Sequence, residues 1–163
     1  MDEASQLLSF HRTLHQTLLD GLERGLVAAV ALDFPQAARC FGAVAQTVTA
    51  HRRDEEAALA ELSEHEPPRG AGQALIVAEH DKLDALLATA LATLDALSGL
   101  AELPLDAQRL ALVRHLDTLL RVKHLLEHHT LRENEILYPH LLIHLPEAKR
   151  QVLEHALARL LDA

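Results

Sequence analysis

Two short stretches of this 163-residue chain pair a histidine with a glutamate four residues later. The pairs are His51 with Glu55 and His129 with Glu133. Residues four apart on a helix lie on the same face about one turn apart, so both side chains of a pair can reach one point. Imidazole nitrogens and carboxylate oxygens together suit iron, zinc, copper or manganese. The spacing therefore indicates metal chemistry.

Two further histidines, His11 and His80, lie on the segments that precede these two pairs. Side chains at one level of an alternating helix bundle need turns near the sequence midpoints between them, because both arms rise ~1.5 Å per residue. The midpoints between consecutive members of the set fall at residue 31, at residues 67–68 and beside Pro104. Helix-breaking sequence stands at each of these places. We therefore predict that the six side chains converge at one level.

The elements that would position these side chains are helices, because apolar residues recur at helical spacing along most of the chain. The interruptions contain proline, glycine or acidic turn residues. The pattern predicts four long helices and a short fifth one, over residues 3–31, 35–64, 71–98, 105–138 and 147–161. Short connections favour an all-α, up-and-down antiparallel four-helix bundle. We expect a single domain over residues 1–163, with its core at residues 5–140.

Composition limits the classes of partner. The net charge of −9 argues against nucleic acid and anionic membranes, both of which attract clustered positive charge. The acidic, polar N-terminus and the absence of a long apolar segment predict a cytoplasmic protein. The single Cys40 excludes a thiolate-rich metal site. The apolar stripe on the last predicted helix either caps the bundle or forms a homodimer surface, so we expect a monomer or a homodimer.

Helical periodicity separates inward from outward histidines. His129 shares a face with Val122 and Leu126, whereas His128 is turned about 100° away and is expected outside. Buried histidine and glutamate side chains cost free energy unless they are paired or bind a cation. A bound metal would supply that compensation. The other closely spaced histidines, which lack a converging carboxylate, are expected on solvated faces: His124 with His128, and His140 with His144.

The ordered set of histidines and glutamates, with Tyr138 and Pro139 after the last glutamate, resembles the hemerythrin-like, or HHE cation-binding, domain family. The resemblance extends over about residues 5–140 and implies a four-helix bundle with a non-haem di-iron centre. Its terminal ligands would be His11, His51, His80 and His129. Glu55 and Glu133 would bridge the two irons, together with a solvent-derived oxo or hydroxo group. Zinc or manganese would also suit these donor types.

The chain departs from the oxygen carriers of that family at one position. Those proteins have a second histidine one turn along the third helix, where this chain has Asp84. His15, four residues after His11, is the matching position on the first helix. If His15 coordinates, the ligand count is restored, and we include His15 in the predicted metal-ligand set. If it does not, both irons keep open sites. Asp84 is expected to be an outer hydrogen-bond acceptor or solvated.

Three functions remain open from the sequence. The first is reversible binding of dioxygen or nitric oxide for storage, delivery, scavenging or sensing. The second is a peroxidase-like or catalase-like enzyme whose open sites activate peroxide. The third is a structural or interaction bundle that uses metal only for stability. The sequence does not decide whether the protein is an enzyme.

Overall fold

The computed structural model describes residues 3–62, 65 and 68–162, and over these residues the chain is helical without any strand. Four long helices are followed by a π-helical turn and two shorter helices. In chain order the elements are α1 (Glu3–Val30), α2 (Phe34–Ala60), α3 (Gln73–Ser98), α4 (Leu105–Arg132), η1 (Glu133–Leu137), α5 (Tyr138–His144) and α6 (Glu147–Leu161).

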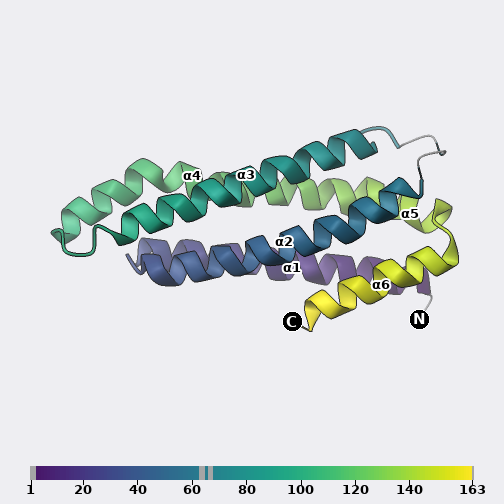
Figure 1. Ribbon diagram of the computed structural model, residues 1–163, viewed down its shortest axis with the longest axis horizontal. Helices are drawn as coiled ribbons and strands as arrows, with labels where there is room; N and C mark the ends of the chain where they lie inside the picture. Colours follow the sequence, from purple (N-terminus) through teal and green to yellow (C-terminus); the bar gives the residue numbers. More distant parts are fainter. Residues whose placement is uncertain (1–2, 63–64, 66–67, 163) are drawn as a thin grey trace.

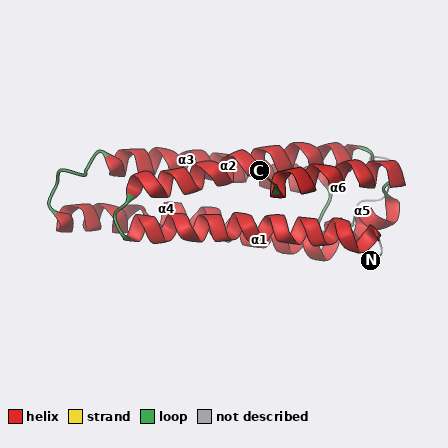
Figure 2. Ribbon diagram, turned by 90° about the horizontal axis from the view of Figure 1, so that it is seen from below, coloured by secondary structure: helices red, strands yellow, loops and turns green. Residues whose placement is uncertain are grey.

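The four long helices lie side by side as a bundle (Figures 1 and 2). α2 packs against α1 and α3, and α4 packs against α3 and α1. α6 lies along α1 and α2, so its apolar stripe covers the bundle, with Leu153 and Leu157 buried. None of the described helices combines the length and the apolar character that crossing a membrane requires. The prediction of an all-helical bundle is thus confirmed.

The turn between α1 and α2 follows from local sequence. Leu32 adopts a positive φ of 63° and reverses the chain. The side chain of Asp33 then accepts a hydrogen bond from the backbone N–H of Gln36 at 3.0 Å, which caps the first turn of α2. Pro35 occupies that first turn, where its missing N–H costs nothing.

Two glycines let α1 and α2 approach each other closely. A Cβ atom at Gly25 would lie 2.7 Å from the ring of Phe41, and one at Gly21 would lie 2.8 Å from Val44. Both distances are shorter than real contacts, and Phe41 is fully buried. These glycines therefore serve helix packing, although glycine lowers helix propensity.

Most predicted helix ends are correct to within a few residues, and the fifth helix matches its predicted range. The second helix ends at Ala60 rather than at residue 64; residues 63–64 lie outside the described part of the chain. The prediction that Pro139 ends the fourth helix is wrong. The helical path continues through η1 and α5 as far as His144.

The π-helical turn explains how the chain passes Pro139. Proline has no N–H and its ring would clash with the carbonyl four residues earlier in an α-helix. In η1 the backbone N–H of Tyr138 instead bonds to the carbonyl of Glu133, five residues back. The wider turn lets the chain continue helically into α5, with Pro139 in its first turn. Glu133, a predicted ligand, begins this turn.

Candidate metal centre

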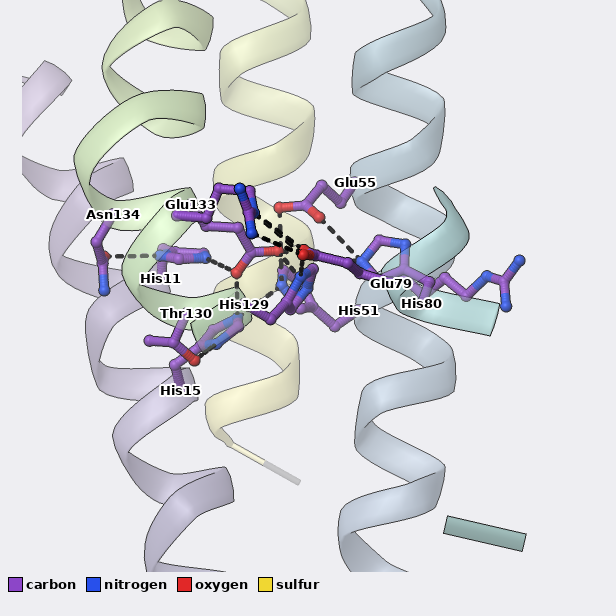
Figure 3. A network of polar contacts seen from close by, with 12 residues as sticks. His11, His15, His51, Glu55, Glu79, His80, His129, Thr130, Glu133 and Asn134 are labelled. Carbon is purple, nitrogen blue, oxygen red and sulfur yellow. Dashed lines mark hydrogen bonds and ion pairs between the residues drawn. The ribbon is translucent and has the colours of Figure 1, made fainter. Parts of the chain in front are cut away.

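All seven predicted ligands lie together in the core of the bundle, and each is at most 3% exposed. They come from all four long helices and from η1 (Figure 3). The predicted convergence at one level is therefore confirmed. The residues are His11, His15, His51, Glu55, His80, His129 and Glu133.

Their donor atoms form two groups, and either group could hold a metal ion. Within each group the donor atoms lie within 4.8 Å of one another. One group has three imidazoles and the other has two, and Glu133 belongs to both. The groups are His11, His15, His51 and Glu133, and Glu55, His80, His129 and Glu133.

Glu133 spans the two groups with its two oxygens. Oε2 lies 3.1 Å from Nε2 of His11 and 3.2 Å from Nε2 of His15. Oε1 lies 2.6 Å from Nε2 of His129. One carboxylate therefore offers an oxygen to each group, as the predicted bridging role requires.

Glu55 has a similar orientation on the opposite helix. Its Oε2 lies 3.2 Å from Nε2 of His80, and its Oε1 lies 3.9 Å from Nε2 of His51. His51 belongs to the three-imidazole group and His80 to the two-imidazole group. The two oxygens of Glu55 thus also face different groups.

Several of these buried atoms have no hydrogen-bond partner among the described residues. They include both oxygens of Glu55, Oε1 of Glu133 and Nε2 of His80. They lie within 4.8 Å of the other donor atoms of their group without forming a hydrogen bond. Leaving a buried polar group unsatisfied costs about 1–3 kcal/mol. A cation between these atoms would satisfy them, so the donor set fits a metal.

Four of the five histidines have an outer partner at the ring nitrogen that faces away from the groups (Figure 3). Such a partner fixes the ring and, with the proton on Nδ1, would leave Nε2 available to a metal, which is the usual arrangement of metal-bound histidine. Nδ1 of His51 has no partner among the described residues. The pairs are His11 with Asn134 at 3.1 Å, His15 with Thr130 at 2.6 Å, His80 with Glu56 at 2.9 Å and His129 with Glu79 at 3.0 Å.

The chain matches no protein-family model, no curated protein and no solved structure. The family resemblance therefore stays a prediction. What the site can do follows from its own residues.

The outer partners were not predicted, although the sequence carries a signal for them. Each one directly neighbours a predicted ligand in the chain and serves a histidine on an adjacent helix. Glu56 follows Glu55 on α2 and accepts from His80 on α3. Successive helical residues are rotated by about 100°, so the neighbour of an inward ligand points sideways towards the next helix.

Charged residues hold two of the outer acceptors in place. Arg132 donates to Glu79 at 2.9 Å, and its Nε atom also donates to the same carboxylate at 3.1 Å. Arg52 contacts Glu56 at 2.8 Å. Asp84 accepts from Arg52 at 2.7 Å and lies outside both groups. Asp84 is thus an outer acceptor, and it is His15 that joins the candidate ligands.

The electrostatics of the metal-free site are uneven. Burial lowers the pKa of His51 to about 3 and lowers the pKa of His15 well below its usual value. Burial and the charge of Glu133 raise the pKa of Glu55 to about 7. Burial opposes the charge on His129, but Glu133 and Glu79 outweigh it and raise the pKa of His129 to about 10. In the metal-free site, His129 is therefore in its positively charged form at neutral pH.

Apolar side chains close the site along the bundle axis. Leu7 and Leu14 flank His11 on α1, and Val48, Leu83 and Leu126 lie on the other three helices, all of them buried. These side chains limit access of bulk water, and electrostatic interactions are stronger where water is excluded.

The remaining histidines mostly lie where the sequence predicts. His124 and His128 are exposed, as is His144. His140 is only half-buried rather than solvated, and its ring centroid lies 4.3 Å from that of His144. Tyr138 is fully buried, with its ring against His11.

Proposed function

We propose that this chain is a non-haem di-iron protein of the hemerythrin-like kind, which binds dioxygen or nitric oxide reversibly. The observation that carries the proposal is the shared carboxylate of Glu133, which faces His11 and His15 with one oxygen and His129 with the other. Two metal ions, rather than one, match two groups of donors that meet at a common residue.

The donor chemistry supports iron. Five imidazoles and two carboxylates form a nitrogen-rich set without thiolate. Zinc and manganese accept the same donors, so elemental analysis decides between the three metals. Iron, when bound, supplies the electrons that allow dioxygen to bind and leave again.

The unequal groups support reversible binding over peroxide turnover. His15 adds a third imidazole beside His11 and His51, while His80 and His129 provide only two. The group with His80 and His129 therefore offers fewer imidazole ligands, which would leave a metal there able to bind a ligand from solution. Metal ions held by these two groups would be less fully coordinated on the side of His80 and His129, which would suit a diatomic ligand.

The surrounding residues favour retention of a bound gas over its consumption. Buried leucine and valine side chains restrict protons and water, which would otherwise drive oxidation of the site. The outer acceptors Glu56 and Glu79 keep the imidazoles of His80 and His129 oriented. The protein would thus store, deliver, scavenge or sense the gas.

The order of the helices, the location and the oligomeric state that the sequence predicts belong to the same proposal. α1 to α4 would follow an up-and-down antiparallel order, and the chain would act in the cytoplasm as a monomer or a homodimer. Its partner would be dioxygen, nitric oxide or peroxide, and neither nucleic acid nor a membrane.

The test is a cycle of gas exchange on protein loaded anaerobically with ferrous iron. We expect an absorption band that forms under dioxygen, disappears under argon and returns over several cycles. Steady consumption of added peroxide without a stable band would instead favour the enzyme. Absence of any band or turnover would leave only a metal-stabilised bundle.

A further inference from the structure

Tyr138 brings an unpaired hydroxyl group into the site. Its side chain is fully buried, and its hydroxyl has no hydrogen-bond partner among the described residues. Its ring centroid lies 3.6 Å from that of His11, with the two planes tilted by 33°. The ring therefore lies directly against one of the candidate ligands.

The π-helical turn is what brings Tyr138 to this position. Residues five apart on an α-helix point about 140° away from each other, because each residue turns by about 100°. The η1 turn joins Tyr138 to Glu133 by a bond from N–H to carbonyl across five residues, and both side chains are buried. π-helical turns of this kind are frequent at functional sites.

A structural role alone does not account for the hydroxyl. Phenylalanine would keep the ring contact with His11 and avoid an unsatisfied buried O–H, which costs free energy. The hydroxyl of a tyrosine is a hydrogen-bond donor, and here it lacks an acceptor among the described residues.

Glu55 lies near the Tyr138 hydroxyl, but the two form no hydrogen bond of good geometry in the described part of the chain. The two oxygens of Glu55 face His51 and His80, where the proposed metals would bind them. The group that completes the site must then be one that enters from outside.

We propose that the hydroxyl of Tyr138 donates a hydrogen bond to an anionic exogenous ligand in the site. This inference rests on the proposed di-iron function and adds a specificity-determining residue to it. The donor favours ligands with strong acceptor atoms, such as azide or reduced dioxygen, over poor acceptors such as nitric oxide.

The test compares the wild-type protein with Tyr138→Phe after iron loading. Iron content is measured first, and affinity for azide and for nitric oxide is then measured by optical titration. We expect equal iron content, azide affinity about tenfold lower in the variant, and nitric oxide affinity unchanged. Leu141→Met, a conservative change in the same short helix, should leave azide affinity unchanged.

Other outcomes overturn the inference in distinguishable ways. Equal azide affinity with full iron content rejects the role of Tyr138 and leaves the di-iron function standing. Loss of iron from the variant means that the hydroxyl acts on Glu55 or the metals. A wild-type chain without bound metal rejects both proposals. The metal-free variant should unfold at the same or a higher temperature, and a clear fall would reveal a structural partner for the hydroxyl.

Discussion

The Nε2 atoms of His15 and His51 lie 2.9 Å apart in the buried core. Burial lowers the pKa of both imidazoles, so both are neutral at pH 7. The Thr130 hydroxyl lies 2.6 Å from the far nitrogen of His15 and holds that ring; where it accepts the proton of that nitrogen, the Nε2 lone pair faces His51. Two facing nitrogen donors, with an oxygen of Glu133 3.2 Å from His15, are the arrangement that a metal ion would complete.

His15→Ala is expected to weaken metal binding and to change gas binding. The variant loses one of the three imidazoles in its group, so its affinity for the ion in that group should fall. Losing only a hydrogen-bond partner of a ligand lowers metal affinity roughly 10- to 100-fold, and losing the ligand itself should lower it more. The dioxygen adduct should decay faster, as measured by its absorption band, and the rate of peroxide turnover should rise. His128→Ala, which removes an exposed histidine, is the control. Unchanged iron content and oxygen binding in His15→Ala would show that His15 is not a ligand.

Glu79→Ala is expected to reduce metal affinity without removing a ligand. Glu79 accepts from Nδ1 of His129 at 3.0 Å, and its loss frees that ring to turn. The expected loss of affinity is about 10- to 100-fold, measured by competition with a chelator. Glu79→Gln keeps an acceptor and should lose less. The exposed Glu135→Ala serves as the control, and equal affinity in all three variants would contradict the role of Glu79.

Metal loading is expected to release protons at pH 7. His129, with a pKa of about 10, is charged in the metal-free protein, and Glu55, with a pKa of about 7, is about half protonated. Both must be deprotonated to bind a cation, so binding releases roughly one to two protons and affinity falls as the pH is lowered from 8 to 6. Calorimetry in buffers with different ionisation enthalpies measures the release. Binding without proton release would refute this protonation pattern.

Gly25→Ala and Gly42→Ala should have opposite effects on stability. A Cβ at Gly25 would overlap the buried ring of Phe41, so this change should lower the free energy of unfolding by about 1–3 kcal/mol. At Gly42 a Cβ meets nothing within 4 Å, and alanine should stabilise α2 by about 0.5–1 kcal/mol. Urea unfolding of the two variants checks both signs. Equal effects would mean that close approach of α1 and α2 does not depend on Gly25.

The sequence predicts where along the bundle the candidate ligands meet, but not which residues hydrogen-bond to them. Inward positions follow from helical period, and the turn midpoints predict that His11, His51, His80 and His129 meet. His15 enters the ligand set through the family resemblance, which calls for one more histidine one turn along a helix, and it is buried beside Glu133. These predictions succeed because a helix fixes the direction of each side chain relative to its neighbours.

Two features of the structure do not follow from helical spacing in the sequence. The path past Pro139 depends on a π-helical turn, and proline in a helical pattern normally predicts a helix end. Outer partners such as Asn134 and Thr130 depend on how neighbouring helices are rotated against each other. That rotation is set by packing contacts between distant segments, which spacing within one helix does not encode.

The measurement that tests the central claim most directly is the metal-to-protein ratio. Elemental analysis would be made on protein purified without a histidine tag and without added metal. We predict two irons per chain, one for each group of donors around Glu133. A chain that holds no metal, even after anaerobic reconstitution with ferrous iron, would contradict the account and assign the buried histidines to the fold alone.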